Sequence, residues 1–166
     1  MQLFFKKNIN ENNFTLDKNE SNHICKVLRK KEGEEVYFTD GNGQLITTKI
    51  LIADINKTHL QVIKRELQPK NHNYYLHIAI APTKSIDRYK FFIEKATEIG
   101  IDEITPIICN RSERKIIKEE KINKIIISAI KQSLKYHMPK LNSVTNFKNF
   151  IKRNFKEDKY IAHCNK

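Results

Sequence analysis

The feature of the sequence that most constrains its fold is an apolar periodicity that ends at a glycine. Five apolar side chains recur at the spacing of one helical face: Tyr89, Phe92, Ile93, Ala96 and Ile99. Gly100 follows directly, and glycine adopts the left-handed conformation of a helix C-cap at little cost. Apolar runs at 76–81 and 104–108 flank this segment. We therefore predict a strand, a helix over 86–99 and a second strand, which together form a βαβ unit.

The alternation of strand and helix continues toward the C-terminus. The pattern predicts a strand at 103–109, a long helix at 113–137 and a further strand at 159–164. The apolar stripe of the long helix is formed by Ile122, Ile126, Ile130 and Leu134. Such alternation is typical of an α/β fold with a mostly parallel sheet. Interior strands seldom end a domain, so we expect the chain to be truncated or an amino-terminal piece of a longer protein.

Residues 1–68 carry a different, β-rich pattern. Short apolar runs around an Asp-Gly-Asn-Gly turn cluster predict a hairpin and one more strand, at 36–39, 44–55 and 59–63. A helical turn is expected between residues 19 and 30, with an apolar side made of Ile24, Val27 and Leu28. Several short strands and one short helix in so few residues predict a small β-barrel.

The stretch 69–75 separates these two patterns. It begins with Pro69 and is otherwise polar apart from its final tyrosines, which is typical of a connection between domains. We therefore expect a barrel domain at 1–68, a linker at 69–75 and an α/β domain at 76–166.

The charge of the chain favours a polyanionic partner. Its 31 Lys and Arg residues exceed its 19 Asp and Glu residues and give a formal net charge of +12. Up to residue 75 there are 12 basic and 9 acidic residues, and after it 19 and 10, so the excess lies mainly in the second part. Nucleic acid is the first candidate. The alternative is a lysine-rich composition whose charge has no functional meaning.

The cysteines and the hydropathy of the chain indicate the cellular compartment of the protein. Cys25, Cys109 and Cys164 are widely spaced and form no Cys-x-x-Cys pair, so neither a disulfide framework nor a zinc site is indicated. The N-terminus lacks the apolar core of a signal peptide, and no apolar run approaches membrane-spanning length. We expect a cytoplasmic protein with no membrane or metal partner.

The glycine content excludes several cofactor sites. The whole chain contains Gly33, Gly41, Gly43 and Gly100, so it holds no P-loop and no other glycine-rich cradle for a phosphate or nucleoside. No nucleophile–base pair stands out among the residues, and the catalytic residues therefore stay unassigned. We expect any small-molecule cofactor to be bound by a segment that these residues do not include.

Basic residues are the best candidates for a functional surface. Arginine suits phosphate better than lysine because its planar fork donates two parallel hydrogen bonds. Arg29 and Arg111 follow structured segments, whereas Arg88 and Lys95 lie seven residues apart on one side of the predicted helix. His23 begins the short helix and could contact a ligand or serve as a structural cap.

Two lysine-rich helix faces keep a second interpretation open. Glu94 and Glu98 lie near Lys90 and Lys95, so that face could be a solvated network of ion pairs. The long helix carries lysines roughly opposite its apolar stripe: Lys121, Lys124, Lys131 and Lys135. A solvated face explains these lysines about as well as contact with RNA does.

Taken in order, these residues resemble a known family. The motif residues are Lys84, Arg88, Lys95-Ala96-Thr97-Glu98-Ile99-Gly100, Ile104-Thr105-Pro106 and Arg111-Ser112. Upstream come His23 to Arg29 and Asp40-Gly41, and downstream Gln132-Ser133 and Pro139. The combination resembles the bacterial 16S ribosomal RNA uridine-N3 methyltransferases, which join a PUA-like RNA-binding barrel to a SPOUT-type α/β domain. The resemblance covers nearly the whole chain.

The resemblance implies an activity and its partners. It implies methylation of N3 of a uridine in 16S ribosomal RNA with S-adenosylmethionine as cofactor, by an enzyme that binds the small ribosomal subunit and forms a homodimer. The barrel would grip RNA, and basic residues of the α/β domain would lie near the reactive base. His23, Arg29, Lys84, Arg88, Lys95 and Arg111 are the residues expected at these surfaces.

Two departures from the family pattern limit what this chain is expected to do. The arginine that usually accompanies the N-terminal Phe-Phe pair is missing from Met1 to Phe5. The glycine-rich loops that hold the cofactor in the family have no counterpart before Lys166, so we expect an incomplete SPOUT-type domain, a cofactor site beyond Lys166 and an inactive 166-residue chain. The alternative function is a non-catalytic RNA-binding module in ribosome assembly. A DNA-binding function is less favoured because no helix-turn-helix pattern is present.

Overall fold

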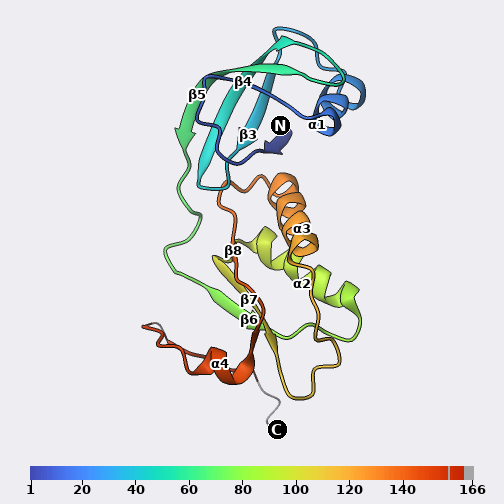
Figure 1. Ribbon diagram of the computed structural model, residues 1–166. Helices are drawn as coiled ribbons and strands as arrows, with labels where there is room; N and C mark the ends of the chain where they lie inside the picture. Colours follow the sequence, from blue (N-terminus) through green and yellow to red (C-terminus); the bar gives the residue numbers. More distant parts are fainter. Residues whose placement is uncertain (157, 163–166) are drawn as a thin grey trace.

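The chain forms two packed modules along an elongated molecule (Figure 1). The computed structural model describes residues 1–156 and 158–162. The first module holds a five-stranded sheet in the order β1-β3-β4-β5-β2, and the second a parallel sheet in the order β6-β7-β8 with β9 also paired to β7. The first sheet is built from β1 (Leu3–Phe5), β2 (Asn13–Thr15), β3 (Glu35–Thr39), β4 (Gln44–Ile52) and β5 (His59–Leu67).

The first module is a curled half-barrel around its own core. The predicted hairpin is confirmed, because β3 and β4 pair antiparallel with Val36 opposite Thr48. The sheet curls around buried apolar side chains that include Phe4, Phe38 and Ile46, while β1 and β2 lie at its two edges. The barrel-like prediction is therefore confirmed, in the form of a sheet that is not fully closed.

The predicted helical turn is present as two short helices, α1 (Lys18–Asn22) and the π-helical turn η1 (His23–Val27). Asp17 caps the first, since its side chain accepts a hydrogen bond of 3.0 Å from the Glu20 N–H. Ile24 is fully buried, as predicted, but Val27 is 62% exposed. The expected apolar face is wrong at Val27 because a π-helical turn rotates this position away from the side that carries Ile24.

The βαβ unit of the second module matches its prediction closely. Strand β6 (His77–Ile80) and strand β7 (Glu103–Ile108) pair in parallel, and α2 (Ile86–Ile99) joins them. Gly100 has a φ of +107° and ends the helix as a left-handed C-cap. Four of the five predicted apolar positions pack inward, but Ile99 is 70% exposed. The buried residues of the helix are Tyr89, Ile93, Ala96 and Thr97, and at 100° per residue Ile99 lies outside the face that they form.

The second long helix, α3 (Glu119–Gln132), is shorter than the 113–137 segment that the sequence predicted. Its buried stripe of Ile122, Ile126 and Ile130 is confirmed. Residues 113–118 form an irregular segment instead, because Ile117 packs into the core from it. At the other end the chain turns at Leu134, whose φ is +52°, and this residue is 38% exposed.

The C-terminal part differs from its prediction. Two short strands, β8 (Lys140–Leu141) and β9 (Thr145–Asn146), add to β7 in parallel, and α4 (Phe147–Ile151) follows them. The predicted strand at 159–164 is wrong over 159–162, which form no strand in the described chain, and Tyr160 is 90% exposed. Residues 163–164 lie outside the described residues. Residues 159–162 pair with no other described strand, and a strand exists only as part of a pairing.

A turn of the first module is locked against the segment that follows α3. The Gly43 N–H donates to the Tyr136 carbonyl at 2.9 Å, and the Met138 N–H donates to the Gly41 carbonyl at 2.8 Å. The His137 ring donates from Nε2 to the Gln68 carbonyl at 2.8 Å. These contacts join residues that are about 70 to 100 positions apart in the chain, so they fix the two modules relative to each other.

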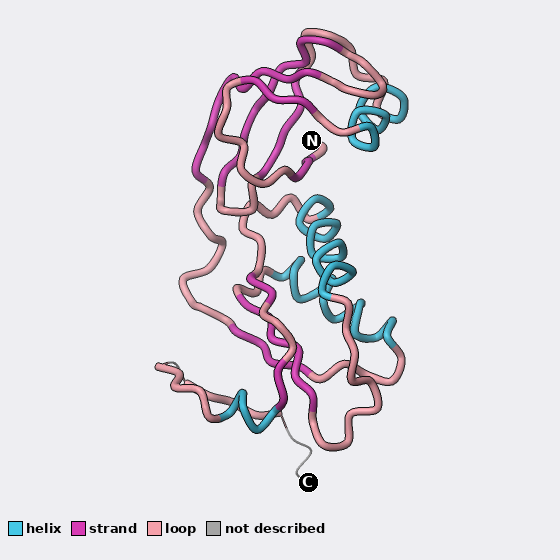
Figure 2. The backbone as a smooth tube through the Cα atoms, in the orientation of Figure 1, coloured by secondary structure: helices cyan, strands magenta, loops and turns pink. Residues whose placement is uncertain are grey.

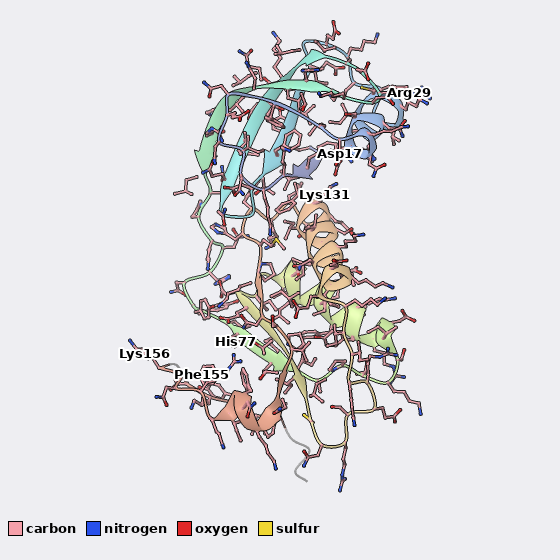
Figure 3. All side chains as sticks on the ribbon, viewed as in Figure 1. Asp17, Arg29, His77, Lys131, Phe155 and Lys156 are labelled. Atoms are coloured by element: carbon pink, nitrogen blue, oxygen red, sulfur yellow. The ribbon has the colours of Figure 1, made fainter. Side chains whose placement is uncertain are left out.

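Lys131 reinforces this junction. Its ammonium lies 3.1 Å from a carboxylate oxygen of Glu20 and 5.2 Å from the ring centroid of Phe4, both in the first module. Figure 3 shows Lys131 at the end of α3 that faces that module. The sequence left open whether Lys131 lies on a solvated face or contacts RNA. In the structure its ammonium takes part in a contact between the two modules.

Asp102 anchors the connection between the modules. Its carboxylate accepts hydrogen bonds from Lys70 Nζ and from the Leu76 N–H, the latter at 2.8 Å. Its own carbonyl accepts from the Lys140 N–H at 2.8 Å. Partial burial raises the pKa of the Asp102 carboxyl, but the hydrogen bonds from Lys70 and Leu76 outweigh it and leave the pKa below its ordinary value.

The described part of the chain contains no helix long and apolar enough to cross a membrane. Its longest helices, α2 and α3, each have 14 residues and each carries charged side chains along one face. Both helices pack their apolar faces against the parallel sheet and against each other.

Replacing Gly43 by alanine is expected to lower the free energy of unfolding by roughly 2–4 kcal/mol. The φ of Gly43 is +92°, and an added Cβ would lie 2.4 Å from Cε1 of His137. The matched control is Gly33→Ala, where φ is +86° and the nearest atom lies at 3.8 Å. Urea unfolding should give a clearly larger loss for Gly43→Ala, and equal losses would show that His137 moves aside at no measurable cost.

Asp102→Asn is expected to cost roughly 1–3 kcal/mol of unfolding free energy at pH 7. Because the folded-state pKa of Asp102 is lowered, its contribution is present above the ordinary pKa of about 4 and is lost as the pH falls below it. The difference from the native chain should therefore shrink between pH 5 and pH 3. Asp87→Asn is the control, because its pair with Lys90 is largely exposed. A loss at Asp102 that is independent of pH would contradict the prediction.

Candidate nucleic-acid interface

The carboxyl edge of the parallel sheet brings two loops together. The loop at 81–85 follows β6, and the segment at 109–118 follows β7. Because the two strands are parallel neighbours, both connections leave from the same edge, which is where α/β proteins usually bind ligands. Figure 2 shows these connections as long loops at the end of the second module that is remote from the first.

A network of polar contacts ties these two loops to each other. Nη2 of Arg114 donates to the Lys84 carbonyl at 3.0 Å, and Lys84 Nζ lies 3.3 Å from a carboxylate oxygen of Glu113. Within the second loop, the Cys109 N–H donates to Ser112 Oγ at 2.9 Å. The loops therefore hold a defined shape, and their outward side chains are presented from a fixed backbone.

Three of the predicted residues lie on the segments that form this edge: Lys84, Arg88 and Arg111. Lys84 lies in the first loop, Arg88 in the first turn of α2 and Arg111 in the second loop. All three are exposed, and among the described residues neither arginine has an ion pair. Two unpaired guanidinium groups and a largely exposed ammonium give this edge the chemistry of an anion-binding surface.

Lys95 lies away from this edge and has carboxylate partners. It is seven residues beyond Arg88 on α2, or about 10 Å along the helix axis. Its ammonium lies 2.8 Å from Glu94 and 3.0 Å from Glu98, and these hydrogen bonds raise its pKa. The contacts favour the interpretation of this face as a network of ion pairs.

His23 and Arg29 lie on the first module. His23 Nε2 is 3.0 Å from the side-chain nitrogen of Gln2, and its ring meets Phe4 edge-on at 5.7 Å between centroids. Arg29 has a φ of +54° and an exposed side chain. Figure 3 shows Arg29 at the far end of the molecule from the carboxyl edge of the parallel sheet. The six predicted residues therefore belong to separate surfaces.

Sequence reasoning missed the role of Arg114. Arg114 bridges the loops through a contact between residues 30 positions apart, and its Nε is buried without a partner among the described residues. In the sequence Arg114 follows the Arg111-Ser112 motif by two residues. This local spacing carries no information about a hydrogen bond to the distant Lys84 carbonyl.

Sequence reasoning also missed a polar network on the sheet face away from α2. The carboxylate of Glu103 accepts from the Tyr75 hydroxyl and, at 2.5 Å, from Asn142 Nδ2, which also lies 2.7 Å from Thr105 Oγ1. Thr105 Oγ1 lies 2.7 Å from His77 Nε2. Partial burial raises the pKa of Glu103, but the hydrogen bonds from Tyr75 and Asn142 outweigh it and lower the pKa. These mutual contacts make the network a structural tie across the sheet.

The described residues do not fit a nucleoside cofactor of the kind that needs a glycine-lined cradle. Gly33, Gly41, Gly43 and Gly100 all have positive φ values, and each belongs to a turn, the module junction or a helix cap. In the described ranges, no three His, Cys, Asp or Glu side chains are grouped as metal ligands. We therefore assign no described residue to a cofactor or a metal.

Two family models match the chain. A model of an RNA methyltransferase PUA domain covers residues 16–64, and a model of an RNA methyltransferase domain covers residues 70–166. Among curated proteins, Ribosomal RNA small subunit methyltransferase E of Mesomycoplasma hyopneumoniae (strain 232) is 30% identical over 159 residues. That alignment covers 92% of this chain and 66% of the relative.

Solved structures share the fold. A crystal structure described as a probable rRNA-methyltransferase from Porphyromonas gingivalis superposes with a TM-score of 0.87 at 35% identity, over 94% of this chain and 65% of that one. The Ribosomal RNA small subunit methyltransferase E from Neisseria gonorrhoeae, bound to S-adenosyl methionine, gives 0.78 at 21% identity, over 94% and 67%. At this lower identity the likeness concerns the fold alone.

These comparisons confirm the predicted fold class, a PUA-like barrel followed by a SPOUT-type α/β domain with a mostly parallel sheet. The chain spans slightly less than two thirds of the length of the Mesomycoplasma and Porphyromonas proteins. With one matching model over residues 70–166, more than half of its length, the chain belongs to the RNA methyltransferase domain family.

Proposed function

We propose that this protein serves in S-adenosylmethionine-dependent methylation of N3 of a uridine in 16S ribosomal RNA. The observation that carries the proposal is the carboxyl edge of the parallel sheet in a domain of the RNA methyltransferase family, where Lys84 and Arg111 lie in two tied loops and Arg88 lies in the first turn of α2. The relatives that the chain matches are named as small-subunit ribosomal RNA methyltransferases, which supports ribosomal RNA as the substrate.

The reaction class fits the residues of this edge. Methylation of a ring nitrogen needs the RNA to be held so that the nitrogen faces the methyl donor, and it needs the N3 proton to leave. Arg88 and Arg111 are proposed to hold phosphates on either side of the target nucleotide, and Lys84 is proposed to contact a third. Arg114 is proposed to position Lys84, because it binds the carbonyl of that residue.

The remaining parts of the proposal concern organisation. We propose an RNA-binding unit at 1–68, a connector at 69–75 and a methyltransferase unit at 76–166, acting in the cytoplasm on the small ribosomal subunit. A homodimer is also proposed, and the exposed Phe91 and Ile99 of α2 offer apolar surface for a second copy. The cofactor is proposed to bind outside the described residues, because these lack a suitable cradle.

The activity is tested with S-adenosylmethionine and small-subunit RNA. Residues 1–166 are expected to show no cofactor binding by calorimetry and no methyl transfer, whereas a longer chain that continues through the glycine-rich loops of the family should show both. N3-methyluridine blocks base pairing, so reverse transcription should stop at one modified site. Micromolar cofactor affinity in the 166-residue chain would place the site inside it. RNA binding without methyl transfer by that longer chain would favour the non-catalytic module.

RNA binding is expected to depend strongly on salt. If Arg88 and Arg111 contact phosphates, replacing either by glutamine should reduce the slope of log affinity against log salt by about 0.7–0.9. Lys95→Gln is the comparison on the same helix, and we expect a smaller change in slope because carboxylates already surround its ammonium. Filter binding from 50 to 300 mM salt measures the slopes. Equal effects of all three substitutions would contradict the assignment of the contact to the carboxyl edge.

A further inference from the structure

The first module, which is proposed to bind RNA, contains a hollow whose role is not yet assigned. It lies beside β2 and the start of β5, under the loop at residues 6–12, and has a volume of about 600 Å³. Pockets that bind small ligands have volumes of roughly 300–1,000 Å³. The hollow is therefore large enough for one nucleotide, and it lies on the other module from the carboxyl edge of the parallel sheet.

The loop that borders the hollow is held in place from beneath. Ile9 is only 5% exposed and packs into the core of the module. The guanidinium group of Arg65 donates to the Ile9 carbonyl at 2.6 Å and to the Glu11 carbonyl at 3.2 Å. Asn8 has a φ of +56°, and its carbonyl accepts from the Asn10 N–H at 3.0 Å. A ligand would meet a preformed wall, so binding would not have to order this segment.

The lining of the hollow combines three kinds of group. Amide side chains come from Asn8, Asn10 and Asn13, and none of them has a hydrogen-bond partner among the described residues. Phe14 supplies an aromatic ring, and Lys6 Nζ lies 5.8 Å from the centroid of that ring. Amides donate to and accept from base edges, aromatic rings stack on bases, and an ammonium attracts phosphate.

We propose that this hollow binds one unstacked nucleotide of a single-stranded RNA segment, an inference that rests on the RNA-binding unit proposed for residues 1–68. A base within a duplex is covered by its neighbours, so a recessed site of this kind accepts only a base that has left the stack. The exposed amides contact the base, and Lys6, which lies over the ring of Phe14, attracts its phosphate. Glu11 also lines the hollow, and its carboxylate repels an anionic ligand. Removing this charge should therefore strengthen RNA binding.

Isosteric charge changes test the proposal without disturbing the fold. Asn10→Asp and Asn13→Asp each place a negative charge at the exposed lining and should weaken binding of a single-stranded RNA oligonucleotide by roughly 5- to 100-fold. Asn12→Asp is the matched control, because Asn12 is exposed in the same loop but does not line the hollow. Glu11→Gln removes the opposing carboxylate and should tighten binding. Fluorescence anisotropy measures the affinity of the native 166-residue chain and of these four variants for the oligonucleotide.

The outcomes separate this proposal from its competitors. Equal losses for Asn12→Asp and the two lining variants would overturn it, since the effect would be general electrostatics. A uridine or adenosine monophosphate that binds as tightly as the oligonucleotide would also overturn it, in favour of a free-nucleotide site. In a nuclear magnetic resonance titration, shifts centred on residues 8–15 and 59–60 support the hollow, whereas shifts elsewhere contradict it. None of these results depends on methyl transfer, so a failure of the proposed activity is distinguishable.

Discussion

Parallel pairing between β6 and β7 is the constraint on which the candidate interface depends. Parallel strands require a crossover, and α2 provides it, so the loops that follow the two strands emerge at one edge. Arg114 then ties the second loop to the first by binding the Lys84 carbonyl. Residues 84 and 111 are far apart in the chain, and only this pairing brings their loops together.

The contacts at the junction hold the two modules, and the basic residues on each of them, in one fixed arrangement. The ring of His137 lies so close to Gly43 that no larger residue fits there without movement, and Lys131 pairs with Glu20 across the same boundary. These contacts surround backbone hydrogen bonds between residues 41–43 and 136–138. Because the modules cannot rotate freely, the distance between Arg29 and the carboxyl edge is set by the fold. An RNA that contacted both ends, as proposed, would have to match that spacing.

Features that depend on residues close together in the sequence could be predicted from it, whereas features that depend on distant residues could not. The α2 helix, its Gly100 cap and the β3–β4 hairpin are specified by neighbours within a few residues, and all three are found as predicted. Strands β8 and β9 have two residues each, so they carry no periodicity and exist only through their pairing with β7. The roles of Lys131 and Arg114 depend on partners 111 and 30 residues away, which no local pattern encodes.

The distribution of charge shows why a basic composition alone does not locate an interface. Of the lysines predicted to face solvent or RNA, Lys131 is used at the junction and Lys95 is surrounded by two carboxylates. An ammonium that is already paired releases few counterions when RNA approaches, so it adds little to salt-dependent affinity. The unpaired guanidinium groups of Arg88 and Arg111 retain that capacity. Positive charge that is free of ion pairs, as on these two arginines, is therefore a better guide to a candidate interface than the net charge of the chain.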